Sequence, residues 1–162
     1  MKNVCLILLV MMLLTGCDTA EVYETVSDEQ IVVASVEPRE VHFDLAQEPI
    51  MPAMESDSGT LYLCGDFDVS VQTLQSGDLQ STVYEVSGFL PEELTLIQTG
   101  SGDVDKYEFV WTSATDAGQQ IGRATILDDG NYHYVLSAMV EAELMAEYQE
   151  IWNGIFESFH LD

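Results

Sequence analysis

Basic side chains are scarce in this chain of 162 residues, which has 4 Lys and Arg against 29 Asp and Glu and a formal charge of −25. Proteins bind nucleic acids largely by neutralising phosphates with Lys and Arg, so this balance excludes nucleic-acid binding. The same negative charge opposes adsorption to anionic lipid headgroups. Any attachment to a membrane must therefore be hydrophobic or covalent.

Histidine and cysteine are also scarce, with three of each. His42, His133 and His160 are isolated in the sequence, and no HExxH or CxxC spacing occurs, so no zinc site is expected. No G-x-S-x-G nucleophile motif is present either. The sequence therefore predicts a protein that is not an enzyme and has no cofactor.

The N-terminal residues have the layout of a signal peptide. Lys2 precedes an uncharged apolar run, Val4 to Leu14, which as a helix would rise only about 16 Å and could not cross a hydrocarbon layer of about 30 Å. Leu14-Thr15-Gly16-Cys17 follows and resembles the lipobox of bacterial lipoproteins at all four positions. The resemblance implies cleavage after Gly16 and thioether lipidation of Cys17. The alternative is an ordinary signal peptide with a coincidental cysteine.

Processing would leave a mature chain of charge −26, held by its lipids on the extracytoplasmic face of the cell membrane. Of the cysteines, only Cys64 would keep a free thiol, so no intramolecular disulfide is expected. A half-buried residue beside a turn is favoured for Cys64 over a reactive thiol. The predicted organisation is a signal peptide over 1–16, a lipidated Cys, acidic tether and extended segments over 17–59, and a globular domain over 60–162.

Within the globular domain, local patterns predict the first elements. Apolar spacing and turn residues predict strands over Thr60–Leu63 and Phe67–Leu74, a helix from Leu79 to near Gly88 that Asp78 caps, and a strand over Leu94–Thr99 before a turn at Gly100–Asp103. Upstream, Ile31–Val33 and Val41–Leu45 are expected to be short extended segments that add to an edge. The fold class is therefore expected to be α+β.

Residues 107–139 are predicted to form a three-stranded antiparallel meander. A turn at Asp129-Gly130 would place Leu127 opposite Tyr132, Thr125 opposite Tyr134 and Arg123 opposite Leu136. A loop at 115–118 would place Trp111 opposite Gly122, Phe109 opposite Ala124 and Tyr107 opposite Ile126. One face then pairs large with small side chains, and Arg123, Tyr132 and Tyr134 share the other. An amphipathic helix over about 141–158 is available to cover a face.

The order of strands, helix, antiparallel strands and a C-terminal helix closing on Ser158-Phe159-His160-Leu161 resembles the PsbP-like sandwiches. The resemblance covers about residues 60–162 and implies an antiparallel sheet flanked by helices, with the C-terminal helix packed on the sheet. That group includes photosystem accessory proteins and many bacterial lipoproteins. The resemblance implies a binding or scaffolding role.

Arg123 is the candidate ligand-binding residue, together with Tyr132 and Tyr134. A cation flanked by aromatic rings can receive a carboxylate or a phosphate, but an ion pair with Glu108 on the neighbouring strand explains the same pattern and is favoured. The acid pairs Asp66/Asp68, Asp103/Asp105 and Asp128/Asp129 are expected to be solvated turn residues and not metal ligands.

The function predicted from the sequence is that of a membrane-anchored lipoprotein that binds an envelope protein or a small ligand without catalysis. The alternative is a surface protein that binds divalent cations or hydrolyses a substrate with a carboxylate pair.

Overall fold

The computed structural model describes residues 36–45, 52–116 and 118–162. The predicted signal peptide, Cys17 and the segment Ile31–Val33 lie outside the described residues. The sheet belongs to a compact unit that spans Ser35–Asp162. Residues 36–45 and 52–59 belong to this unit. Among the described residues, no helix has both the length and the apolar character needed to cross a bilayer.

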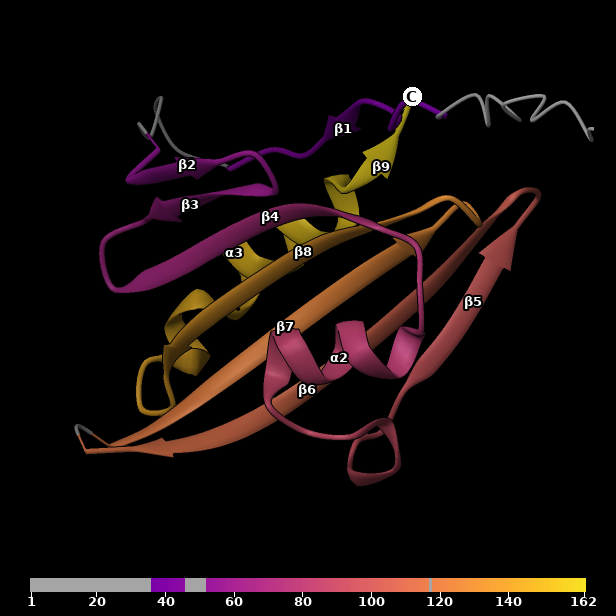
Figure 1. Ribbon diagram of the computed structural model, residues 1–162. Coiled ribbons are helices and arrows are strands. Elements are labelled where there is room, and N and C mark those ends of the chain that lie inside the picture. Colours follow the sequence, from indigo (N-terminus) through magenta and orange to yellow (C-terminus); the bar gives the residue numbers. More distant parts are fainter. Residues whose placement is uncertain (1–35, 46–51, 117) are drawn as a thin grey trace, which may run out of the picture. The chain divides into compact units, whose positions relative to one another are not determined.

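The fold class is α+β, as predicted, and is built on one seven-stranded antiparallel sheet (Figure 1). The strands of this sheet, in spatial order, are β2 (Met54–Ser56), β3 (Gly59–Leu63), β4 (Phe67–Gln75), β8 (Tyr132–Glu141), β7 (Gly118–Asp128), β6 (Val104–Thr115) and β5 (Ile97–Ser101). Two short strands, β1 (Val41–His42) and β9 (His160–Leu161), form a separate antiparallel pair. Their partnership differs from the predicted addition of Val41–Leu45 to an edge of the main sheet.

Helices cover both faces of the sheet. Helix α2 (Leu79–Ser87) contributes Val83 to a core with Phe109, Trp111 and Val135 on one face. Helix α3 (Met145–Ser158) buries Trp152, Ile155 and Phe156 against the other face, where Tyr134 and Leu136 lie. The faces are those predicted, because side chains alternate along each strand.

The local signals at α2 act as predicted. Asp78 caps the helix by accepting a hydrogen bond from the Gln80 N–H at 3.2 Å, and Gly88 ends it in the left-handed conformation with φ 78°. His133 of β8 is buried in the core, and its Nδ1 lies 2.8 Å from Thr82 Oγ1 of this helix. This contact between Thr82 and His133 joins α2 to β8.

The predicted register is confirmed for one hairpin and wrong for the next. Trp111 faces Gly122 and Phe109 faces Ala124, as expected. Between β7 and β8, however, Leu127 pairs with Tyr134, so the register is displaced by two residues. The longer turn is stabilised because the Asp129 carboxylate accepts hydrogen bonds from the N–H groups of Asn131 and Tyr132. A displacement of two leaves every side chain on its predicted face.

One strand was not predicted, and two predicted element boundaries are wrong. Strand β2 (Met54–Ser56) is not among the strands that the sequence predicts. Strand β5 runs over Ile97–Ser101 and not Leu94–Thr99, because Leu94 and Leu96 pack into the α2-side core and only Gly102 and Asp103 remain for the turn. Helix α3 starts at Met145 because β8 stays paired as far as Glu141.

Candidate functional site

The strand β6 is longer than its neighbour β5, and this difference leaves an open edge in the sheet. Pairing between the two strands ends at Ile97 and Glu108, whereas β6 continues to Thr115. Among the described residues, no strand pairs with the outer side of β6 over 109–115. Two large apolar side chains are exposed along this edge, Val110 at 55% and Ile97 at 57%. Exposed strand edges are templates for pairing with another chain.

An open groove of about 810 Å³ follows this edge and reaches both faces of the sheet; it is called the edge groove below. On the α2 side it is lined by Phe89, Leu94 and Trp111, and on the α3 side by Arg123, Gln149 and Asn153. The groove therefore occupies the place where a further strand would lie beside β6. It offers an apolar wall on one face of the sheet and a polar wall on the other.

The backbone orientation of β6 at the groove follows from its hairpin with β5. Ser101 and Val104 flank the turn at Gly102 and Asp103, and the residues that flank a two-residue turn exchange hydrogen bonds. Every second residue of β6 from Val104 onward therefore directs its N–H and C=O toward the β5 side. Val110 and Thr112 belong to this set, and β5 does not extend far enough to pair with them.

Arg123 lies at the floor of the edge groove, and its guanidinium already has protein partners. It donates to Asn153 Oδ1 at 2.9 Å and lies 3.4 Å from Glu108 Oε1. Its Cζ is 4.3 Å from the ring centroid of Phe156, which is a cation–π distance. Lys106 Nζ also lies 3.3 Å from Glu108 Oε1. These contacts include the predicted ion pair of Arg123 with Glu108.

The structure does not bring Tyr132 and Tyr134 to Arg123. Arg123 pairs with Ala138, whereas Tyr134 pairs with Leu127, farther along the strands. The Tyr132 hydroxyl donates to the Val36 carbonyl at 2.8 Å. The Tyr134 hydroxyl donates to Asp129 at 2.9 Å and accepts from the Arg39 N–H. The two tyrosines thus hold the segment around residues 36–39 against the sheet.

Asp129 is the most strongly hydrogen-bonded carboxylate near these tyrosines. Burial acts to raise its pKa, but the hydrogen bonds from Tyr132 N, Asn131 N and the Tyr134 hydroxyl outweigh burial and lower the pKa below its ordinary value. The positive charge of Arg39 acts in the same direction. The pKa of Tyr134 is raised, first by burial and then by Asp129. Asp129 is therefore a structural acceptor that stays ionised.

The edge groove is the feature that sequence reasoning missed. The alternation of Leu94 and Leu96 with the polar Thr95 gives the pattern of a strand that would have covered β6 farther along. Only the tertiary packing of Leu94 and Leu96 against the α2-side core separates this segment from β6.

Comparison with known proteins gives likenesses to solved structures and no assigned family. No family model and no curated protein matches the chain, so the resemblance to PsbP-like sandwiches remains a prediction. The chain is similar to a solved structure described as "Crystal structure of LpqN involved in cell envelope biogenesis of Mycobacterium tuberculosis". The identity is 14%, the TM-score is 0.44, and the match covers 77% of this chain and 86% of that one.

Proposed function

We propose that this protein is a lipid-anchored extracytoplasmic binding module that receives an extended peptide segment along the β6 edge. The observation that carries the proposal is the edge groove, which continues the line of β5 beside unpaired backbone groups of β6. Addition of a strand to an open edge supplies main-chain hydrogen bonds, and side-chain pockets on alternate sides supply specificity. The groove has such walls on both faces of the sheet.

Charge favours a basic segment as the occupant. At the groove, Arg123 and Lys106 share the carboxylate of Glu108 and Glu93 is exposed, so these local charges cancel and the charge of the whole chain decides. The whole chain has a formal charge of −25. A peptide that bears Lys or Arg therefore gains attraction on approach, and an acidic peptide is repelled. We infer that the partner is an envelope protein with an extended basic segment.

The main-chain part of this proposal can be tested with proline at the edge. Val110→Pro removes one N–H that points into the groove, and proline is tolerated on an edge strand where its nitrogen faces solvent. Val110→Ala keeps the N–H and serves as the matched control. Fluorescence anisotropy would measure the binding of a short labelled peptide that alternates Val and Lys. We expect binding to the original chain and to Val110→Ala, and roughly tenfold weaker binding to Val110→Pro.

Two further measurements keep the test decisive. Hydrogen exchange on the original chain should show that the Val110 and Thr112 amides become protected when the peptide is added, whether or not the proline variant folds. A peptide that alternates Val and Glu should bind much more weakly, and added salt should narrow the difference. No change at the two amides would refute strand addition, and equal binding of both peptides would refute the preference for a basic segment.

The anchoring part of the proposal depends on Leu14-Thr15-Gly16-Cys17. Intact-mass measurement on protein from its native host should find a chain that begins at Cys17 and has fatty acyl groups attached. Cys17→Ser should abolish the lipid and release the protein from the membrane fraction. An unprocessed chain without acyl groups would refute the anchor.

The hydrolytic alternative has less support at this site. An acid suited to general acid catalysis has a raised pKa within a cleft. Burial raises the pKa of Asp68, but Asp68 lies on β4 and does not line the edge groove. Of the acids that line the groove, Glu108 is paired with two cations. This arrangement favours binding over catalysis as the role of the groove.

A further inference from the structure

The short ribbon of β1 and β9 brings together two histidines that the sequence separates widely. His42 pairs with His160 across the two strands, and the Asp162 N–H donates to the Glu40 carbonyl at 3.1 Å. Glu40 and His42 are two residues apart on one strand, and His160 and Asp162 are two apart on the other. Because side chains alternate in a strand, all four project from the same face of the ribbon. Two of the three histidines of the chain meet here.

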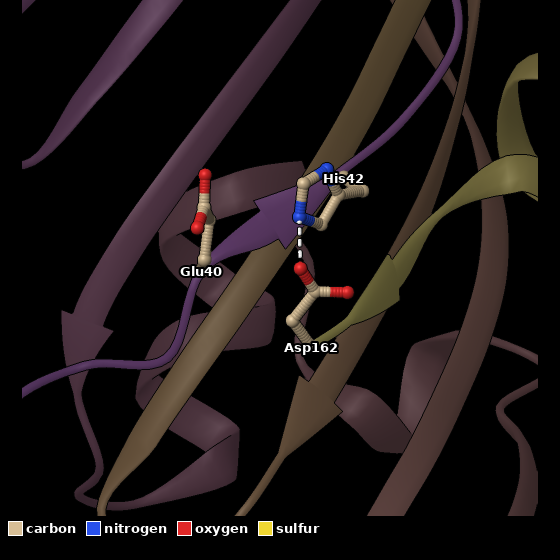
Figure 2. Close-up of side chains that lie close together, drawn as sticks. All are labelled: Glu40, His42 and Asp162. Atoms are coloured by element: carbon tan, nitrogen blue, oxygen red, sulfur yellow. Dashed lines mark hydrogen bonds and ion pairs between the residues drawn. The ribbon is translucent and has the colours of Figure 1, made fainter.

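The side-chain atoms of this group are already close to one another. Ligand atoms of Glu40, His42 and Asp162 all lie within 4.8 Å of one another. Figure 2 shows the His42 ring bonded to the Asp162 carboxylate, with Nε2 and Oδ2 2.6 Å apart, and the Glu40 carboxylate beside them. The His42 and His160 rings are stacked with centroids 5.4 Å apart, and His160 Nε2 lies 4.0 Å from Asp162 Oδ1.

The hydrogen bonding of His160 favours the tautomer that a metal ligand needs. Its Nδ1 lies 2.7 Å from the Ser158 carbonyl oxygen, which can only accept, so in neutral His160 the proton belongs on Nδ1. The lone pair of Nε2 is then free on the side of Asp162. Metal-ligating histidines commonly donate their other ring N–H to a carbonyl in this way.

Among the described residues, neither carboxylate of the group forms an ion pair with Lys or Arg. Glu40 and Asp162 are neighbours across the ribbon, and like charges in that relation destabilise a sheet. Arg39, the nearest cation by sequence, directs its Nε to the main-chain carbonyl of Asp162 and its Nη1 to Asp103. A bound divalent cation would neutralise the two carboxylates directly.

We propose that Glu40, His42, His160 and Asp162 form a surface site for a divalent transition metal of the Zn²⁺ type. Two imidazole nitrogens and two carboxylate oxygens make the four-ligand set that Zn²⁺ accepts, whereas Ca²⁺ and Mg²⁺ prefer oxygen ligands alone. To bind the ion, Nε2 of His42 gives up the hydrogen that it shares with Asp162: a protonated imidazole releases it to solvent, and a neutral one takes the tautomer with its hydrogen on Nδ1. The bound ion joins β1 to β9. It thereby fastens the segment that follows the predicted tether to the C-terminal strand of the domain.

The experiment is a titration of the full chain in detergent with Zn²⁺, followed by calorimetry and by the imidazole resonances of the histidines. We expect one Zn²⁺ per chain, with shifts at His42 and His160 and none at the buried His133. Zn²⁺ should also slow hydrogen exchange at the Asp162 amide, because the ion holds the two strands together. Calcium and magnesium should produce neither effect.

Matched variants assign the ligands. Glu40→Gln and the double variant His42→Ala/His160→Ala should each weaken Zn²⁺ binding by roughly tenfold or more. Glu37→Gln removes an exposed carboxylate from the same segment and should leave binding unchanged. All of these variants keep the same cysteines, so any Zn²⁺ that cysteine binds is the same in each and does not affect the comparison. Undiminished affinity in the double histidine variant, or no shift at His42 and His160, would overturn the site while leaving the edge groove proposal untouched.

Discussion

Gly122 lies directly against the indole of Trp111, its partner across β6 and β7, and a Cβ atom at residue 122 would overlap the ring atoms Cε2 and Cζ2. Trp111 is buried, and its ring cannot move aside without disturbing Phe109, which is 5.7 Å away between centroids. We therefore expect Gly122→Ala to lower the free energy of unfolding by about 1 to 3 kcal/mol through overpacking. Urea denaturation followed by tryptophan fluorescence measures the change.

Gly154 provides the matched control for this substitution. It lies in α3, is exposed, and a Cβ atom added there would have no heavy atom within 4 Å outside its own helix turn. Alanine is favoured over glycine inside a helix, so Gly154→Ala should raise the free energy of unfolding by about 0.5 to 1 kcal/mol. If both substitutions changed stability in the same direction, the close packing of Trp111 on Gly122 would not be the cause.

The Trp111 and Gly122 pair also shows which parts of the fold the sequence determines locally. The register of β6 with β7 follows from the short loop between them and from the pairing of a large indole with a glycine, which has no side chain. This register was therefore predictable. The register of β7 with β8 was not, because it depends on the Asp129 carboxylate reaching back to the N–H groups of Asn131 and Tyr132. Sequence patterns predict which face of a strand a side chain lies on. Hydrogen bonds from a side chain to nearby N–H groups decide the length of the turn and hence the register.

The two candidate sites depend on contacts between residues far apart in the chain. The pairing of His42 with His160 needs β1 and β9 to meet, and no local pattern marks a pairing of two such short strands. The edge groove depends on where β5 stops pairing with β6, which is set by the packing of Leu94 and Leu96 against the α2-side core. By contrast, the ion pair between Arg123 and Glu108 was predictable, because it joins near neighbours on adjacent strands of a hairpin.

Asp129 should make the stability of the protein depend on pH in acid. Because its pKa is lower in the folded chain than its ordinary value of 3.8, ionised Asp129 stabilises the fold above that value, and this stabilisation is lost as the pH falls through the folded pKa. Asp129→Asn should therefore cost about 1 to 2 kcal/mol near neutral pH and progressively less below pH 3.8. Urea denaturation at a series of pH values measures both effects.

Asp57, an exposed residue in the turn between β2 and β3, is the control for the loss of one negative charge. Asp57→Asn should change the free energy of unfolding by no more than about 0.5 kcal/mol at every pH of the series. An Asp129→Asn variant that loses the same small amount at every pH would show that the turn does not depend on the ionised carboxylate.

Cys64 should react slowly with thiol reagents while the protein is folded. It is buried, with an exposed fraction of 6%, and its pKa is raised first by burial and then by the charge of Asp68. Since the thiolate is the reactive form, both effects slow alkylation. Peptide mapping after brief treatment with iodoacetamide should find Cys64 mostly unmodified in the native chain and fully modified in guanidinium chloride. Rapid alkylation of the native chain would contradict the buried placement.

Arg123 and Glu108 should be coupled by a measurable free energy, because both side chains are mostly shielded, with exposed fractions of 23% and 27%. Arg123→Met removes the bonds to Glu108 and Asn153 and should lower the free energy of unfolding by about 1 to 3 kcal/mol. In the double variant with Glu108→Gln, the loss should be smaller than the sum of the two single losses, since the contact between Arg123 and Glu108 is removed only once, while Lys106 still lies beside residue 108. A double-mutant cycle from urea denaturation gives the coupling energy.

Adding acetate or phosphate distinguishes a structural ion pair from an anion-binding site at Arg123. If Arg123 served mainly to bind a ligand anion, the salt would stabilise the original chain but not Arg123→Met. We expect the two chains to respond alike, because the Arg123 guanidinium already has its anionic partner within the sheet.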